Sequence, residues 1–537
     1  MSTIETQSAE SAHKRPKRQQ WSGQWGFIIS AIGSAVGLGN IWRFPGVAYE
    51  NGGGAFMIPY LVALLTAGIP ILFLDYSIGH RWRGSAPLAF RRIKRWLESL
   101  GWFQVIICCF IFLYYAAILA WAASYFVFSF TLAWGDDAGA FLTQSYLQLP
   151  ALTADDGSAL PFNFAPAWGV FVPLLLIWIA AIAVMALNLS KGLEKANIFF
   201  MPMLCVTFGI LVVGALFLPG AVDGLNALFT PDFSAIMEPN VWIAAYSQIF
   251  FSLSIAFGIM LTYSSYRRRR ANLTSPGLVV GFANSSFELL AGLGVFSVLG
   301  FMANQAGTTV DKLDNLTGPM LSFVTFPTAI SQMPFGPFFG AMFFLSLLLA
   351  GFTSMLSIFE VVSAGFTDKF GWSRVRAALT IGIPAAAISI GLFGSVSGLY
   401  NLDIVDNFTN NIGVVTSAVL TIVTVIWIAR KGNELAYHLS SISTFKVGFT
   451  WKLLVGVISP LMLGYMLVIT VKDLIEKPYG GYPEFYVATF GWGAVAVMVI
   501  GALGLTYLTK WKFNPEGFTP WPAFPPVSTE TTKGGVR

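Results

Sequence analysis

The chain has 537 residues, of which 55% are hydrophobic and only 11% are charged. Soluble globular proteins carry about 25% charged residues, so this composition excludes a disordered chain and argues against a set of independent soluble domains. The formal net charge of +5 does not indicate nucleic-acid binding, because most Lys and Arg residues lie in short connections between apolar runs.

Apolar runs of membrane-spanning length recur along the chain after a polar tail at residues 1–20. About 20 apolar residues are enough to cross a bilayer as a helix. The runs lack the alternation that is typical of strands, so we expect an all-α polytopic membrane protein. The expected transmembrane helices, about twelve in number, lie at residues 24–50, 54–80, 100–134, 168–187, 194–217, 241–267, 274–302, 338–366, 375–394, 401–429, 450–473 and 483–509.

The basic residues divide the connections between these spans into two classes. Connections after the even-numbered spans are rich in Lys and Arg, whereas residues 135–167, 218–240 and 395–411 contain neither. Short basic connections remain in the cytosol. We therefore expect an uncleaved cytosolic tail at residues 1–20 and a second cytosolic tail at residues 510–537.

Two of the expected spans contain segments that disfavour a continuous helix. The first holds three glycines between Gly33 and Asn40, and the sixth holds the polar segment from Phe251 to Gly258. Glycine costs about 1 kcal/mol per helical position, although it also permits close helix packing in membranes. Interrupted helices at matching positions of two halves indicate the binding site of a transporter. We therefore expect two inverted repeats, at residues 21–217 and 241–429, followed by two further helices within 450–509.

The remaining residues point away from an enzyme. The three cysteines lie inside apolar spans and the three histidines are scattered, so neither disulfides nor a metal-ligand cluster is expected. The sequence shows no pairing of nucleophile and base that would indicate catalysis. It also lacks the repeated charged or carbonyl-rich pore residues of a channel.

Long motifs beside both interruptions resemble the neurotransmitter:sodium symporter family. The motifs are residues 33–45, 50–56 and 242–254, and the resemblance extends from Trp21 to the last span. It implies the fold of the bacterial LeuT-like amino acid transporters, a five-plus-five inverted repeat with discontinuous helices 1 and 6. It also implies sodium-coupled amino acid uptake across the bacterial inner (plasma) membrane.

The resemblance implies two sodium sites built from uncharged oxygens. The first would use Ala35, Asn40, Ser252 and Asn284 together with the carboxylate of the bound substrate. The second would use Gly33, Val36, Ala350, Thr353 and Ser354. Amides, hydroxyls and carbonyls are the ligands that hard cations take. Outside such a motif, neighbouring Thr and Ser residues more often form interhelical hydrogen bonds.

The substrate implied by the resemblance is a neutral, hydrophobic α-amino acid. Monoamine-transporting relatives have an aspartate where this chain has Gly37, so the substrate should bring its own carboxylate, bound by the first helix break and by Tyr115. The expected contact residues are Ser34, Ala35, Leu38, Gly39, Ile111, Tyr115, Phe251, Ser252, Ser254, Phe257, Ser354 and Ile358. Phe257 and Tyr115 are expected to form an aromatic lid. Leucine, methionine, valine and alanine remain open as substrates.

Several charged residues inside the spans are expected to serve coupling and gating. Glu288 stands where chloride-dependent relatives have a serine, and a fixed carboxylate can replace that ion, so we expect independence from chloride. Asp75 matches a family acid that braces the unwound segments, although the sequence alone equally allows a carboxylate near a water-filled vestibule. The expected gates are Arg43 with Asp406 outside and Arg18 with Asp368 in the cytosol, where Trp21 and Tyr266 pack nearby. Glu360 has no assigned role.

The mechanism that follows is alternating access, with sodium ordering the breaks before the external gate closes. A transport-inactive amino acid sensor or receptor on the same fold is the alternative. The expected partners are the amino acid and the lipid bilayer, without nucleic acid, and the protein is a monomer or a homodimer. The coupled sodium number, proton antiport and oligomeric state are left open by the sequence.

Overall fold

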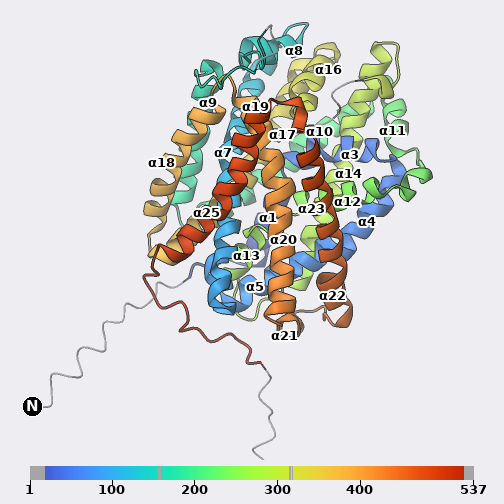
Figure 1. Cartoon of the computed structure of the whole chain (residues 1–537). Coiled ribbons are helices and arrows are strands. Elements are labelled where there is room, and N and C mark those ends of the chain that lie inside the picture. Colours follow the sequence, from blue (N-terminus) through green and yellow to red (C-terminus); the bar gives the residue numbers. More distant parts are fainter. Residues whose placement is uncertain (1–17, 155–158, 314–315, 317, 525–537) are drawn as a thin grey trace, which may run out of the picture.

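The computed structural model describes residues 18–154, 159–313, 316 and 318–524. Nearly all regular structure in these residues is helical, and paired extended backbone is limited to three isolated bridges (Figure 1). The all-α prediction is therefore confirmed. Most of the predicted tail at 1–20, and the part of the predicted tail at 510–537 that follows residue 524, lie outside the described residues.

Long apolar helices dominate the described part of the chain. Ten of them are long and apolar enough to cross a membrane, and one bent pair makes an eleventh candidate. The ten are Gly54–Trp82 (α4–α5), Arg95–Ser129 (ending in α7), Trp168–Ala186 (α9), Leu193–Leu216 (α10), Thr274–Gln305 (α14), Gly336–Phe370 (α17), Arg374–Phe393 (α18), Gly398–Ile428 (beginning with α19–α20), Phe449–Gly481 (α22–α23 and the turn after them) and Glu484–Tyr507 (α24–α25). The chain is thus a multi-pass membrane protein.

The expected helix at residues 100–134 corresponds to α7 (Glu98–Ser129), which ends five residues early, at Ser129. The turns that follow contain Leu132 and Gly135 with φ of 49° and 62°. Such left-handed backbone cannot continue a right-handed helix.

The first expected interruption is a true break. Helix α1 spans Gln24–Ala35, and α2 (Leu38–Trp42) and α3 (Phe44–Glu50) follow after a bend of 52°. Gly37 at the break is extended, with φ −132° and ψ −163°, and its N–H donates to Asn40 Oδ1 at 2.8 Å. The glycine leaves the helical path, and an amide side chain satisfies the peptide group that this exposes.

The second interruption is also present, slightly later than expected. Helix α12 spans Pro239–Ser252 and α13 spans Ile259–Ser265, with residues 253–258 between them. Gly258 has a φ of 91° and directly precedes α13. Helices of 14 and 7 residues are each too short to cross a bilayer alone. The total of twelve spans, and the division into two repeats, therefore stay predictions.

The core of the molecule lies around α7 and α17. The apolar stretches of these two helices are 83% buried, whereas those of α22–α23 and α24–α25 are only 28% buried. The first pair therefore forms the centre, and the last two helices lie at the periphery with most of their apolar surface exposed. Both breaks adjoin this centre, since α1 and α13 each pack against α17.

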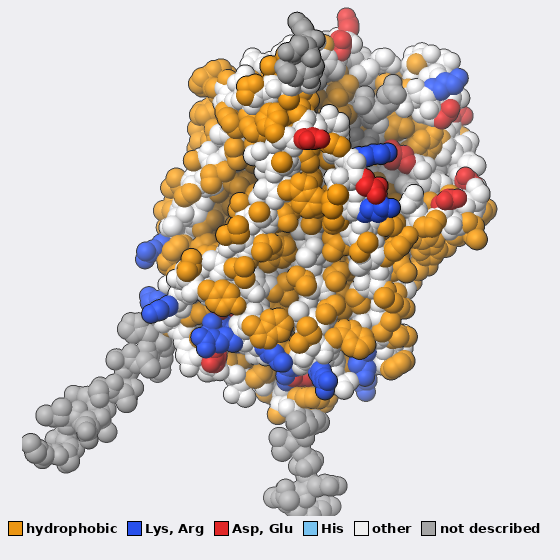
Figure 2. Space-filling view, in the orientation of Figure 1, with side chains coloured by type: hydrophobic (Ala, Val, Ile, Leu, Met, Phe, Trp, Pro, Cys, Tyr) orange, Lys and Arg blue, Asp and Glu red, His pale blue; other side chains and the backbone are white. Residues whose placement is uncertain are grey.

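The surface changes in character along the long axis. Figure 2 shows apolar side chains around the middle, with most of the visible Lys and Arg residues at the end that carries α21 (Gly432–Ile442). We name this the basic end; Arg81, which pairs with Glu434 of α21, belongs to it. A broad apolar belt between polar ends is the surface expected of a membrane protein.

The chain beyond α25 crosses the basic end. Lys512 N donates to Lys369 O at 3.0 Å. Further along, the Arg92 guanidinium lies 4.1 Å from the centre of the Phe518 ring, and Arg81 Nη1 donates to Pro522 O at 3.1 Å. These contacts hold residues 510–524 against the ends of several helices.

Candidate substrate and ion site

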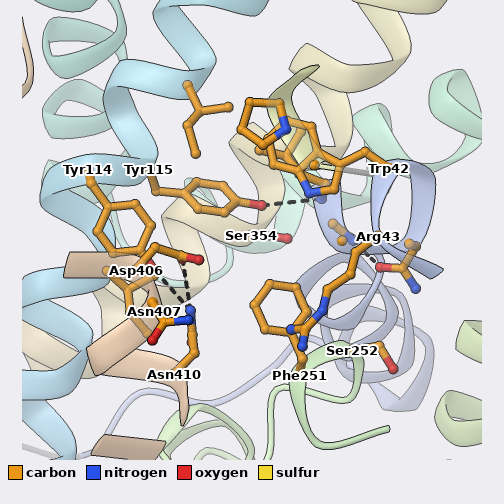
Figure 3. Close-up of a pocket in the computed structure, with 18 of the residues that line it drawn as sticks. Trp42, Arg43, Tyr114, Tyr115, Phe251, Ser252, Ser354, Asp406, Asn407 and Asn410 are labelled. Carbon is orange, nitrogen blue, oxygen red and sulfur yellow. Dashed lines mark hydrogen bonds between the residues drawn. The ribbon is translucent and has the colours of Figure 1, made fainter. Parts of the chain in front are cut away.

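A cavity of about 350 Å³ lies between the two helix breaks. Its lining includes the buried residues Ser34, Phe257 and Ile358 and also the exposed Glu50 and the half-buried Tyr479. Figure 3 shows side chains from both breaks and from α7, α17 and α19 (Gly398–Phe408) pointing into it. The cavity therefore joins the region of both breaks to the side that the charge pattern predicts to be extracellular.

The predicted contact residues converge on this one cavity. All twelve line it: Ser34, Ala35, Leu38, Gly39, Ile111, Tyr115, Phe251, Ser252, Ser254, Phe257, Ser354 and Ile358. They come from four segments that are distant in sequence. Gly318 and Pro319 also line it, and the sequence analysis did not name them.

The part of the cavity beside the first break is small and polar. A Cβ atom on Gly37 would lie 2.9 Å from Ser354 Oγ and 3.1 Å from Tyr115 Oη. The N–H of Leu38 donates to the Tyr115 hydroxyl at 3.4 Å. The absence of a side chain at residue 37 therefore leaves room beside a hydroxyl and the exposed N–H of a helix start, a combination that favours an anion.

Three residues of the predicted first sodium site form a chain of hydrogen bonds. Asn40 Nδ2 donates to Asn284 Oδ1 at 2.9 Å, and Asn284 Nδ2 donates to Ser252 Oγ at 3.0 Å. All three side chains are buried. The group brings amide and hydroxyl oxygens from α2, α14 and the end of α12 together, and these are the donors that a hard cation takes.

Residues of the predicted second sodium site also meet, at α17 and the end of α1. Ser354 Oγ lies 3.4 Å from the carbonyl oxygen of Gly33 and 3.5 Å from that of Val36. Thr353 Oγ1 donates to the carbonyl of Ala350 at 2.9 Å. Ser354 thus brings its hydroxyl to two carbonyl oxygens of the first break, next to Thr353 in the same helix and without a charged side chain.

Glu288 is completely buried and hydrogen-bonded at both carboxylate oxygens. Gln248 Nε2 donates to Oε1 at 2.6 Å, and the Tyr60 hydroxyl donates to Oε2. The Tyr60 oxygen also accepts from Ser285 Oγ at 2.8 Å, a partner that the sequence analysis missed. Because Glu288 lies one turn from Asn284, this carboxylate adjoins the predicted first sodium site.

Asp75 contacts the second break, as predicted. Its Oδ2 accepts a hydrogen bond of 2.9 Å from the N–H of Ala256. The Asp75 carboxylate, on α5 (Ile69–Trp82), therefore accepts the hydrogen bond of a backbone N–H that lies outside any helix.

The aromatic residue next to the external gate differs from the prediction. The Arg43 guanidinium lies 4.7 Å from the centre of the Phe251 ring, whereas the carbonyl of Phe257 accepts from Cys108 Sγ on α7, deeper in the protein. Phe251, not Phe257, therefore occupies the lid position. The break starts two residues later than expected, which leaves Phe251 on the last turn of α12.

The two predicted gates are in opposite states. Arg43 donates to Ser247 Oγ at 3.2 Å and Asp406 accepts from Asn410 at 2.8 Å, so these two charged residues of the described chain form no salt bridge with each other. Arg18, in contrast, donates to both carboxylate oxygens of Asp368, at 3.0 and 2.8 Å. The ion pair predicted at the basic end is therefore formed, and the one predicted beside the cavity is not.

The closed gate is reinforced by neighbouring side chains. Arg18 also donates to Ser265 and lies 4.7 Å from the centre of the Tyr266 ring, while Trp21 Nε1 donates to Tyr263 O at 2.8 Å. Burial by itself would lower the pKa of Arg18, but the charges of Asp368, Tyr266 and Glu360 and the hydrogen bond to Asp368 together outweigh it and hold the pKa above its usual value. The guanidinium thus stays charged in the closed gate.

Glu360, which had no predicted role, belongs to the same end. Arg374 Nη1 donates to both of its oxygens, at 2.7 and 2.6 Å, and the Tyr266 hydroxyl donates at 2.6 Å. The sequence held one hint: Arg374 follows at the start of the next span. Glu360 therefore ties α17 to α18 and to the residue after α13.

Comparison with known proteins gives consistent matches over most of the chain. A family model described as the Sodium:neurotransmitter symporter family matches residues 18–157 and 163–512. The chain is 40% identical over 472 residues to an uncharacterized sodium-dependent transporter of Methanocaldococcus jannaschii, covering 88% of this chain and 94% of that protein. It is 29% identical over 561 residues to the sodium- and chloride-dependent neutral and basic amino acid transporter B(0+) of Mus musculus, covering 92% and 87%. It is 30% identical over 426 residues to the sodium- and chloride-dependent GABA transporter 2 of Bos taurus, covering 73% and 70%.

Proposed function

Because the chain belongs to the sodium:neurotransmitter symporter family, and is thus a sodium-dependent membrane transporter and not an enzyme, we propose that it takes up a neutral, hydrophobic α-amino acid by alternating access. The observation that carries this proposal is the cavity between the two breaks, which brings all the expected contact residues together. A relative named as a neutral and basic amino acid transporter supports the same substrate class.

The carboxylate of the amino acid binds at the first break. The N–H groups of Leu38 and Gly39 and the Tyr115 hydroxyl donate to it, and it completes the first sodium site with Ala35 and Asn40. This arrangement ties substrate affinity to sodium through one shared coordination shell. Ser252 and Asn284 supply the remaining oxygens of that site.

The second sodium ion binds between α1 and α17. Its ligands are the carbonyls of Gly33, Val36 and Ala350 with the hydroxyls of Thr353 and Ser354. In the structure the Ser354 hydroxyl lies within hydrogen-bonding reach of two of these carbonyls. The neutral oxygens suit a monovalent hard cation.

The substrate side chain enters an uncharged pocket. Ser34, Ile111, Phe257 and Ile358 form its wall, and burial of apolar surface there contributes about 25 cal/mol per Å². One methylene changes such binding by only about 1–3 kcal/mol, so related aliphatic amino acids compete with one another. Phe251 closes the pocket beneath Arg43 when Arg43 pairs with Asp406.

Glu288 makes uptake independent of chloride. Its buried carboxylate supplies fixed negative charge next to Asn284. The mouse and bovine relatives are named as chloride-dependent, so this feature distinguishes the chain from them. The test compares sodium-driven uptake by the wild type and Glu288→Ser in chloride and in gluconate: we expect only the variant to need chloride, and chloride-dependent uptake by the wild type would refute the assignment.

The cellular setting follows from the same reasoning. The protein resides in a bacterial inner membrane with both termini in the cytosol, so the basic end with Arg18 and Asp368 is the cytosolic gate. Its fold consists of two inverted repeats, 21–217 and 241–429, and two additional helices within 450–509. It functions as a monomer or a homodimer.

The decisive experiment measures accumulation in proteoliposomes. A thermal-shift panel of the twenty amino acids, in sodium and in potassium, first identifies those that stabilise the protein. Radiolabelled uptake of the best of them is then driven by an inward sodium gradient. Accumulation that requires the gradient supports transport, whereas binding without accumulation would favour a sensor.

A further inference from the structure

The second break is built from backbone that helices do not contain. Ser254 and Ala256 have φ of 52° and 67°, in the left-handed region that residues with a side chain rarely adopt. Such conformations persist only where the surrounding structure fixes them. Residues elsewhere in the fold must therefore hold the break in shape.

Side chains from three helices bind its peptide groups. Asp75 of α5 accepts from Ala256 N at 2.9 Å, and Cys108 of α7 donates to Phe257 O at 3.1 Å. Ser417 of α20 (Val415–Ile422) donates to Ala256 O at 2.6 Å. Ala256 is thus bound on both its N–H and its carbonyl, by side chains of two different helices.

Ser417 uses its hydroxyl in an uncommon way. A serine inside a helix ordinarily donates to the carbonyl four residues earlier in the same helix, but the hydrogen bond of Ser417 reaches another segment. A wider π-helical turn at Thr409–Val414 directly precedes α20. A π-helical turn changes the side of the helix on which the following side chains lie. Such turns occur often at functional sites. The side chain is completely buried, so water does not compete for the bond.

We propose that Ser417 is a positioning residue for substrate and sodium binding, because its hydroxyl holds the Ala256 peptide in the conformation that shapes the cavity. Ser254 and Phe257 flank this peptide, and both line the cavity. Ser417 also lies in the same helical segment as Asp406, Gly398–Ile428. The hydrogen bond therefore links the segment that carries the external gate to the wall of the substrate site. Of the two ligands used in the test below, only L-leucine depends on the proposed amino acid function; sodium does not.

The test compares three variants of the full chain in proteoliposomes. Ser417→Ala removes the hydroxyl, and Ser417→Thr keeps it. Ser389→Ala is the matched control, because Ser389 is equally buried and donates to Leu113 O at the same 2.6 Å, away from the break. The measurements are ²²Na⁺ binding, L-leucine KM and kcat, and Tm.

We expect Ser417→Ala to raise the sodium dissociation constant and the leucine KM about fivefold, because one lost hydrogen bond reduces the population of the binding-competent break by about that factor. The kcat and Tm should match those of Ser389→Ala, and Ser417→Thr should restore both affinities. Affinities equal to those of Ser389→Ala, failure of the threonine to restore them, or loss of folding in Ser417→Ala would each reject the positioning role. If the wild type binds sodium but never accumulates leucine, the leucine assignment fails, and the sodium measurements still decide the role of Ser417.

Discussion

The closed gate at the basic end makes a quantitative prediction for Arg18→Ala. Arg18 donates two hydrogen bonds to Asp368 and two to Ser265, and the side chains of the ion pair are only 14% and 9% exposed. Removing one partner of a buried pair costs about 3–5 kcal/mol. Residual exposure lowers this to about 2 kcal/mol. The closed state alone contains the pair, so the open state should gain about 30-fold in population.

The assay measures access to the cavity of about 370 Å³ that lies at this gate. Ala364 lines that cavity and is 5% exposed, so Ala364→Cys provides the reporter. Cys205 is exposed and is first replaced by serine. A membrane-impermeant thiol reagent applied to the basic end should label the reporter at least about tenfold faster in Arg18→Ala, in line with the shift in population.

A solvated ion pair provides the control. Lys472 and Glu476 are 67% and 59% exposed and lie 3.7 Å apart, so Lys472→Ala should leave the labelling rate unchanged. An unchanged rate in Arg18→Ala, in protein that still binds sodium, would refute the conclusion that this pair closes the basic end.

Four further substitutions, at three positions, test close packing and bracing. Gly39→Ala would place its Cβ 2.1 Å from the Phe251 ring, so the lid must shift and uptake should fall more than about tenfold, measured as kcat/KM. Gly79→Ala would place its Cβ 1.8 Å from the backbone oxygen of Leu261, which cannot yield easily, so detergent-solubilised protein should have a clearly lower Tm without any change in leucine KM. Asp75→Asn keeps an oxygen acceptor but loses its charge, so uptake should fall several-fold, and Asp75→Ala should lose more in the same assay.

The positions of the breaks were predictable because glycine and polar residues inside apolar spans carry a local energetic cost. The cluster of Asn40, Ser252 and Asn284 was also within reach of sequence, since matching motifs imply matching contacts. The aromatic residue under Arg43 was not predictable from the sequence. Whether Phe251 or Phe257 lies there depends on where α12 ends, and helix ends shift by a residue or two because of tertiary packing.

The gates show a second limit of sequence. The motif predicts that Arg43 pairs with Asp406, yet in the structure these two residues form no salt bridge with each other. One sequence must serve both open and closed states, so the sequence alone does not say which state a structure shows. The hydrogen bond between Ser417 and Ala256 was equally unpredictable from the sequence, because it depends on the helical phase, that is, on the direction in which Ser417 points after a π-helical turn. Side-chain type alone does not reveal that phase.

The chain between Lys510 and Phe524 constrains how this protein can be engineered. Phe513 lines the same cavity as Arg18 and Asp368, and the residues after it remain in contact with the basic end as far as Phe524. A fluorescent reporter or affinity tag fused close behind this stretch would be tethered beside that cavity. Expression designs with a long spacer after residue 537 should preserve turnover better than fusions that replace the stretch itself.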